Sequence, residues 1–172
     1  MFVISIIGGP GSGKSTVAAD VFVRLKKMHY NIELVTEYAK DMTWQESLEV
    51  LKNQIYVFAK QHHRLNRLKK KVDIVITDSP ILLSCIYMIG ENQPLVDLIL
   101  HEYNKFDNIL FYLERGTPFK EVGRVHSQNE SKKIDQQILD LINSNHLPYI
   151  HIENIDNASN DIVDAISGRI SQ

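Results

Sequence analysis

Eight residues near the N-terminus have the types and the spacing of a phosphate-binding loop. The segment Gly8–Ser15 reads GGPGSGKS and fits the P-loop pattern G-x-x-x-x-G-K-[ST], between an apolar run and an amphipathic segment. Glycines let the backbone turn through positive φ and bring its N–H groups close to phosphate oxygens. The segment therefore predicts binding of a nucleoside triphosphate, which we take to be ATP with its Mg²⁺.

Each group of this loop has an expected partner. Lys14 would reach the β- and γ-phosphates, and the Ser15 hydroxyl would coordinate Mg²⁺. Thr16 would add a contact to the α-phosphate, and the start of the following helix places a partial positive charge at the same point. The residues predicted to bind ATP are Gly9, Gly11, Ser12, Gly13, Lys14, Ser15 and Thr16, together with Arg115 further along the chain.

A carboxylate at the end of a second buried run completes the expected metal site. Asp78 directly follows the apolar run 74–77, which is the place where P-loop proteins hold a Mg²⁺ ligand. Its alternative role is to cap the helix that follows Ser79-Pro80, and both roles can coexist. We therefore expect Ser15 and Asp78 as the metal ligands.

Other signals separate the classes of P-loop protein. Asn104-Lys105-Phe106-Asp107 matches the guanine-reading string N-K-x-D, but it precedes a predicted strand and no Asp stands three residues before any glycine. ATP-hydrolysing motors place a Glu near the strand-end Asp to orient water, whereas Ser79 and Pro80 follow here. Transfer of a phosphoryl group to an acceptor hydroxyl is therefore favoured over hydrolysis.

A kinase needs a carboxylate that accepts the proton of the acceptor hydroxyl. Glu37 follows the run 32–36, at the edge where open α/β sheets bind their ligands. Asp41, four residues on, is the alternative base, and a solvated strand-end carboxylate is the alternative for Glu37. The expected catalytic residues are Lys14, Glu37, Asp78 and Arg124.

Two arginines, Arg115 and Arg124, belong to a polar stretch, residues 114–130, that is too long for a tight connection. Such a stretch in kinases closes as a lid that excludes water and brings Arg to the transferring phosphoryl group. Arg124 is the expected phosphate contact, and Arg115 would do the same or stack on adenine. Either arginine could instead be a solvated surface residue.

The elements that must position these residues alternate between apolar runs and helix-period segments. We expect strands at 2–7, 32–36, 73–77, 109–113 and 149–152, and a long helix from about residue 45 to 70. This alternation predicts an α/β kinase fold of three layers: a five-stranded parallel sheet with helices on both faces. The 172 residues would form one domain, with a lid at about 115–130 after the fourth strand.

Composition excludes several classes of protein. Nineteen Lys and Arg against 21 Asp and Glu give a net charge of −2, so no overall positive field attracts nucleic acid or membranes. No segment approaches the roughly 20 apolar residues of a membrane span. The single cysteine, Cys85, cannot form an intramolecular disulfide, and we expect a cytoplasmic protein. The charge balance conceals a basic run, residues 60–71, with six Lys and Arg and no acid.

Four segments resemble a known group of enzymes. GGPGSGKST, TEYAKD, NQIYVFAKQ and TDSP are similar to phage and bacterial P-loop kinases related to the nicotinamide riboside kinase domain, and to deoxyribonucleoside kinases. The resemblance implies Glu37 as base and Gln54 as the reader of a nucleobase. The chain departs from the deoxyribonucleoside kinases after the third strand, where Thr77-Asp78-Ser79 replaces Glu-Arg-Ser.

The acceptor is left open among three hypotheses. The first is a free nucleoside or nucleotide, contacted by Glu37, Tyr38 and Gln54. The carboxamide of Gln54 donates and accepts in one plane, as the edge of a base requires, and Tyr38 and Trp44 would stack on a ring or, slightly favoured, pack between elements. An ordinary surface glutamine is the equal alternative for Gln54.

The other two hypotheses change the acceptor or the activity. Related phage kinases act on hydroxymethyluracil in DNA, and this chain would then act in the host cytoplasm. The basic run 60–71 could contact the DNA phosphates, although a solvated helix end explains the run better. The third hypothesis is an ATPase or regulatory module. Oligomeric state is not fixed by the sequence.

Overall fold

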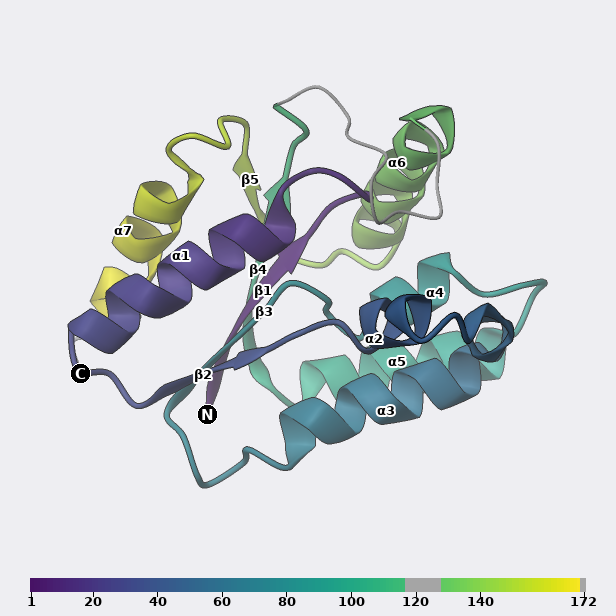
Figure 1. Ribbon diagram of the computed structural model, residues 1–172, viewed down its shortest axis with the longest axis horizontal. Coiled ribbons are helices and arrows are strands. Elements are labelled where there is room, and N and C mark those ends of the chain that lie inside the picture. The colour runs from purple at the N-terminus through teal and green to yellow at the C-terminus, as the bar shows by residue number, and fades with distance from the viewer. Residues whose placement is uncertain (117–127, 171–172) are drawn as a thin grey trace.

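A computed structural model describes residues 1–116 and 128–170 of the chain. Its core is a five-stranded sheet of wholly parallel strands in the order β2-β3-β1-β4-β5 (Figure 1). The five predicted strands are all present, as β1 (Phe2–Ile7), β2 (Ile32–Val35), β3 (Ile74–Thr77), β4 (Asp107–Leu113) and β5 (Ile150–Ile152). The predicted α/β fold is therefore confirmed.

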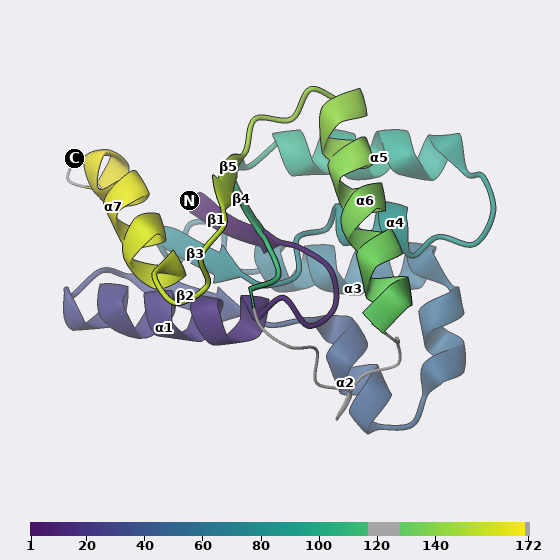
Figure 2. The ribbon, with the colours of Figure 1, turned by 90° about the horizontal axis from the view of Figure 1, so that it is seen from above.

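Helices cover both faces of the sheet, because buried strands must hide apolar side chains on two sides. Ile4 and Ile6 of β1 pack under α1 (Lys14–Lys27) and α7 (Ala158–Ile170), while Val3 and Ile7 face the opposite layer (Figure 2). That layer consists of α3 (Gln54–Asn66), α4 (Leu83–Ile86), α5 (Gln93–Asn104) and α6 (Gln128–Ser144). The three predicted layers are thus present.

The long helix predicted from residue 45 is wrong in its first part. The chain instead forms α2 (Tyr38–Trp44), a turn in which Glu46 has φ 54°, the 3₁₀ helix η1 (Leu48–Lys52), and only then α3. Asn53 starts α3 because its side chain accepts a hydrogen bond from the Tyr56 N–H at 3.2 Å. The apolar residues keep their helical spacing across this break, so their periodicity alone does not reveal that a new helix starts at Asn53.

Parallel strands bring the expected site residues to one edge of the sheet. The last ladder pairs join Val35 to Thr77 and Ser5 to Thr77, so the segments that follow β1, β2 and β3 emerge together. Residues 67–73 precede β3 and therefore lie at the opposite edge, which separates the end of the basic run from the P-loop.

Most of the predicted lid falls outside the residues that the structure describes. Residues 117–127, which include Arg124, lie outside the described part of the chain, and residues 128–130 already belong to α6. Among the described helices, none is long and apolar enough to cross a membrane.

Candidate active site

The P-loop adopts the backbone conformation that its glycines permit. Gly11 and Gly13 have φ of 88° and 92°, in the left-handed region that other residues avoid. Gly13 caps α1, and a Cβ on it would lie 2.2 Å from the Ile155 side chain. The first N–H groups of α1 have no partner within the helix, so they form an anion-binding site at the mouth of the loop.

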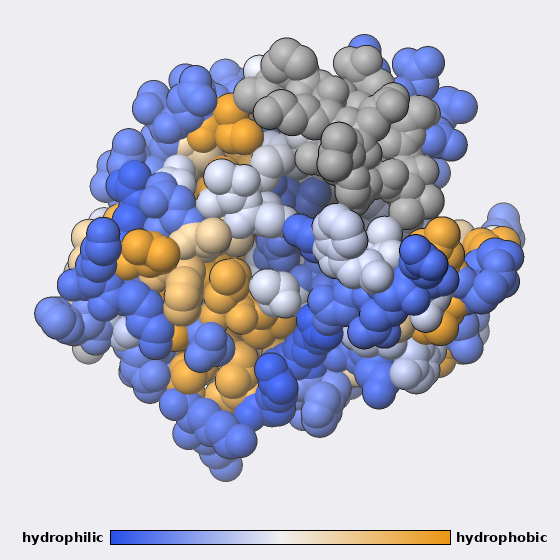
Figure 3. Space-filling view, viewed as in Figure 1, coloured by the Kyte–Doolittle hydropathy of each residue, from blue (hydrophilic) through white to orange (hydrophobic). Residues whose placement is uncertain are grey.

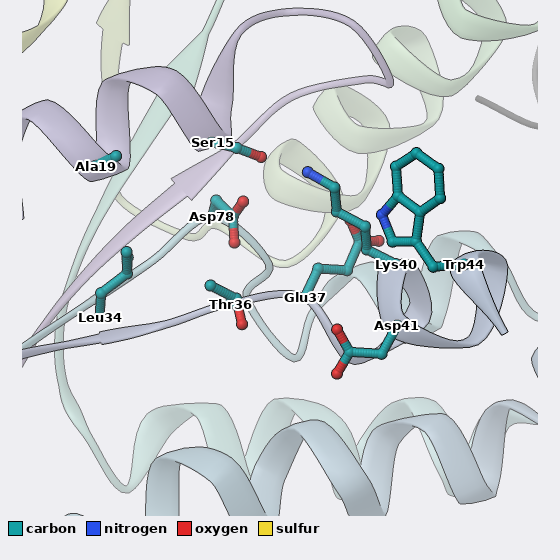
Figure 4. A pocket seen from close by; sticks show the side chains of 9 residues that line it. All are labelled: Ser15, Ala19, Leu34, Thr36, Glu37, Lys40, Asp41, Trp44 and Asp78. Carbon is teal, nitrogen blue, oxygen red and sulfur yellow. The ribbon is translucent and has the colours of Figure 1, made fainter. Parts of the chain in front are cut away.

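The side chains expected at the phosphates and the metal surround this loop. The Lys14 ammonium donates to the Gly9 carbonyl at 2.9 Å, so its amine lies along the loop. Ser15 at the start of α1 and Asp78 at the end of β3 point into the same space (Figure 4). Asp78 is only 5% exposed, and within the described residues its Oδ1 has no hydrogen-bond partner.

A hydroxyl beside an unpartnered, buried carboxylate oxygen is a fitting donor set for Mg²⁺. This ion prefers hard oxygen ligands, and it is usually bound through one or two carboxylates with phosphates completing its shell. The described residues contain no group of three or more His, Cys, Asp or Glu side chains that could hold a metal ion.

Glu37 lies between β2 and α2, where it is the N-terminal cap residue of α2 and lines the same space. Burial raises the pKa of its carboxyl above the ordinary range, the Lys14 charge opposes this rise, and the Asp78 charge adds to it. Lys40, one turn into α2, also lowers the pKa of Glu37. A carboxyl with a raised pKa takes a proton more readily than an ordinary glutamate, which suits a general base.

Two adjoining cavities lie beside the P-loop and Glu37. A cavity of about 790 Å³ adjoins one of about 360 Å³, within the usual size range for small-molecule sites. In Figure 3 the hollow between the start of α1 and α2 is lined by hydrophilic residues. Deeper, the larger cavity has an apolar wall interrupted by a few polar groups: Leu51, Val57 and Leu83, with Gln54, Gln61 and Ser84.

Gln54 is oriented by its own helix. It is 7% exposed, and its Nε2 donates to the Leu51 carbonyl at 2.7 Å. Because that carbonyl can only accept, the Oε1 atom must face the other way, and no described residue donates a hydrogen bond to it. Gln54 is thus a buried residue of the cavity wall with a free acceptor, not the surface glutamine that was its alternative.

The two aromatic residues near Glu37 have different environments. Tyr38 is buried: its ring contacts Tyr56 edge-on at 6.0 Å, the Arg64 guanidinium lies over it, and it lines neither cavity. Tyr38 thus packs between elements, as expected, and its side chain does not reach the space proposed for the acceptor. Trp44 is 68% exposed and lines both cavities, so the same expectation is wrong for Trp44.

The alternative base, Asp41, also lines the smaller cavity, but its carboxylate is paired with another residue. Its carboxylate forms an ion pair with Arg64 on α3, and in Figure 4 it points toward the helices below α2. This ion pair joins α2 to α3 and so helps to hold α2, whose N-terminal cap is Glu37, beside the cavity.

Arg115 is held in a cluster that sequence reasoning did not foresee. Its guanidinium donates to the Pro10 carbonyl at 2.6 Å and pairs with Asp135 of α6 at 2.9 Å. The other oxygen of Asp135 accepts the Gly9 N–H at 2.6 Å. Asp135 lies more than 120 residues from the loop and belongs to no motif, so only the fold reveals that α6 supports the P-loop.

Gln61 is the second residue that sequence reasoning missed. It is buried on α3 and its amide bonds to the segments that carry Glu37 and Asp78. A signal for it existed, because it stands seven residues after Gln54 and therefore on the same face of the helix.

A protein-family model described as an AAA domain matches residues 3–158. That range includes the P-loop and both carboxylates of the site. The chain belongs to this AAA-domain family of P-loop proteins. A search of curated proteins finds no match to its sequence.

Solved structures with the same architecture include two of a deoxyadenosine kinase from M. mycoides. The structure with the products dCMP and a flexible dCDP has a TM-score of 0.63, and the structure with bound dATP has 0.61. In both comparisons the identity is 20%, over 96% of this AAA-domain chain and 99% of the other. At this identity the likeness shows a shared fold.

Proposed function

We propose that the protein is an ATP-dependent kinase that transfers the γ-phosphate to a hydroxyl of a free nucleoside or nucleotide. The observation that carries this proposal is the placement of Glu37: it lines one cavity with Ser15 and Asp78, and it also lines the adjoining cavity of about 790 Å³ with the P-loop. The larger cavity extends from the P-loop to α3 and α4, so it offers space for an acceptor beside the phosphates. The fold shared with a deoxyadenosine kinase supports the same class of reaction.

In the proposed reaction the acceptor oxygen attacks the γ-phosphorus and its proton passes to the Glu37 carboxylate. The bond between the γ-phosphorus and the bridging oxygen breaks, and ADP leaves with the electron pair. Lys14 and the N–H groups at the start of α1 stabilise the phosphate charge, because such fixed donors need no reorganisation during the reaction. Catalysis consists mainly of positioning and charge neutralisation.

Ser15 and Asp78 would hold the Mg²⁺ of the bound nucleotide. Bound there, Mg²⁺ would supply positive charge that offsets the negative charge of the phosphates. Burial is the main cause of the raised pKa of Glu37, and the negative charge of Asp78 adds to it, so the proposed metal ligand also affects the proposed base.

Gln54 supports a nucleobase as part of the acceptor. Its buried Oε1 can only accept a hydrogen bond, so it matches a base edge that carries an N–H donor. The apolar wall of Val57 and Leu83 suits the faces of a flat ring. A substrate that has no hydrogen-bond donor at this point would leave Oε1 buried and unpaired, and its binding would be weaker by about 1–3 kcal/mol.

DNA is a weaker candidate for the acceptor, because the end of the basic run lies at the wrong edge of the sheet. Residues 67–71 precede β3, whereas Glu37 and the P-loop lie where the strands end. Arg64 of the same run pairs with Asp41, and Lys69 lies over the Phe106 ring at 4.4 Å. Both cations are thus engaged in contacts within the protein.

A screen with γ-labelled ATP tests the proposal. The acceptors are deoxynucleosides, ribonucleosides, their monophosphates, and DNA with or without 5-hydroxymethyluracil. Label should appear in a free nucleoside or nucleotide and should depend on Mg²⁺. Transfer only to modified DNA, with a steep dependence on salt, would favour the DNA hypothesis, and ATP hydrolysis unaffected by every acceptor would favour an ATPase.

A further inference from the structure

The amide of Gln61 makes three hydrogen bonds, all of them to backbone groups of the active-site edge. Its Oε1 accepts the Tyr38 N–H at 2.9 Å, and its Nε2 donates to the carbonyls of Ser79 at 3.0 Å and Thr36 at 3.3 Å. The side chain is 3% exposed. It is the one described side chain that bonds to backbone on both sides of Glu37 and also next to Asp78.

The position of these bonds explains their importance. Backbone pairing between β2 and β3 ends at Val35 and Thr77, and the residues just beyond that pair, Thr36, Glu37 and Asp78, line the smaller cavity. Glu37 and Asp78 therefore lie just past the last ladder pair, where the sheet no longer fixes their spacing. Gln61 joins the two strands at this point from the helix below.

We infer that Gln61 is a positioning residue that sets the spacing of Glu37 and Asp78 and thereby the alignment of the acceptor hydroxyl with the γ-phosphate. This inference rests on the proposed kinase function. Only an amide can do this from the Gln61 position: the Tyr38 N–H requires an acceptor, and the two carbonyls require donors. A carboxylate lacks the donors, and lysine or arginine lacks the acceptor.

The three hydrogen bonds of Gln61, which we call the Gln61 bridge, lie next to a second contact between α3 and the end of β2. Arg64, one turn along α3, donates to the same Thr36 carbonyl at 3.1 Å and pairs with Asp41. Arg64 contacts only the β2 side, however, whereas Gln61 reaches both strands. The spacing of the two carboxylates therefore depends on Gln61.

Three variants test this inference. Gln61→Met removes all three hydrogen bonds at similar length, Gln61→Glu keeps the acceptor for the Tyr38 N–H and loses both donors, and Gln136→Met is the control because it removes an exposed side-chain bond to Asp140. Both Gln61 variants should lower kcat by about 10²-fold, as expected for misplaced reacting groups, with an unchanged KM for ATP. The control should leave kcat unchanged.

Amide hydrogen exchange gives a readout that does not depend on activity. The Tyr38 N–H should exchange faster in Gln61→Met than in the wild type, but remain protected in Gln61→Glu. If that pattern appears while the wild type phosphorylates no acceptor, the proposed function fails and the bridge stands. Unchanged kcat in both variants, unchanged Tyr38 exchange in Gln61→Met, or loss of folding in both variants would overturn the inference.

Discussion

The two walls of the cleft are built in different ways. The phosphate wall is one continuous segment, Gly8–Ser15, and acts through backbone N–H groups and the Lys14 amine. The acceptor wall gathers side chains from α2, η1, α3 and α4, and it is held by contacts such as the pair between Arg64 and Asp41.

This difference bears on how each wall responds to change. A backbone site tolerates substitution of most neighbours because its donors belong to the main chain, and its few essential side chains have no replacement. A wall of side chains can change its ligand by single substitutions while the sheet below it stays intact. We therefore expect variants of the phosphate wall to abolish activity and variants of the acceptor wall to change selectivity.

The largest effect should come from Lys14→Ala. Without the ammonium, the charge on the transferring phosphoryl group has no mobile cationic partner in the loop, and transfer from γ-labelled ATP should be abolished. Binding of the acceptor nucleoside, measured by calorimetry, should persist. A variant that transfers phosphate at the wild-type rate would show that the loop does not hold the triphosphate.

Glu37→Gln should lower kcat by about 10²- to 10⁴-fold, since it removes the proton acceptor and keeps the shape of the side chain. Binding of ATP should be unchanged. Glu33→Gln, an exposed change on β2, is the matched control and should have wild-type kcat. Wild-type turnover in Glu37→Gln would assign the base to Asp41 or Asp78.

Gln54→Met should raise the KM for the nucleoside by about 10- to 10²-fold and leave the KM for ATP unchanged, because it removes one buried acceptor from the acceptor wall alone. Steady-state kinetics with each substrate varied in turn measure this. Gln137→Met, an exposed change on α6, is the control. An equal rise in both KM values would indicate a distorted fold instead of a lost contact.

Asp135→Asn should have a smaller effect on the phosphate wall. Asparagine can still accept the Gly9 N–H, but the ion pair with Arg115 is lost, so ATP affinity should fall by about threefold to tenfold. Titration with a fluorescent ATP analogue measures the change. Unchanged affinity would show that α6 does not contribute to the loop through this pair.

The smallest effect concerns pH and stability. Because burial raises the pKa of Glu37, the folded protein binds its proton more tightly than the unfolded chain. The resulting stabilisation is full below the unfolded pKa of about 4.3 and is lost as pH rises through the folded pKa. Urea unfolding should therefore show that Glu37→Gln gains stability relative to the wild type between pH 4 and pH 8, whereas a constant difference would contradict the raised pKa.

The same contrast explains how much the sequence could predict. The P-loop, the strand-end positions of Glu37 and Asp78, and the five strands follow from local pattern, because a parallel sheet brings strand ends together regardless of detail. The break at Asn53, the bridge of Gln61 and the support from Asp135 depend on which side chains meet across the fold. The periodicity of apolar residues does not predict such long-range contacts, so Trp44 was expected to pack and the first part of the long helix was misplaced.

One measurement tests the central claim that both walls form a single transfer site. A bisubstrate compound that joins the terminal phosphate of ATP to the reacting oxygen of the best acceptor found in the screen should occupy both walls at once, and calorimetry should show it binding about 10²-fold or more tighter than ATP. Gln54→Met and Lys14→Ala should each weaken this binding. An affinity no greater than that of ATP alone would contradict the account.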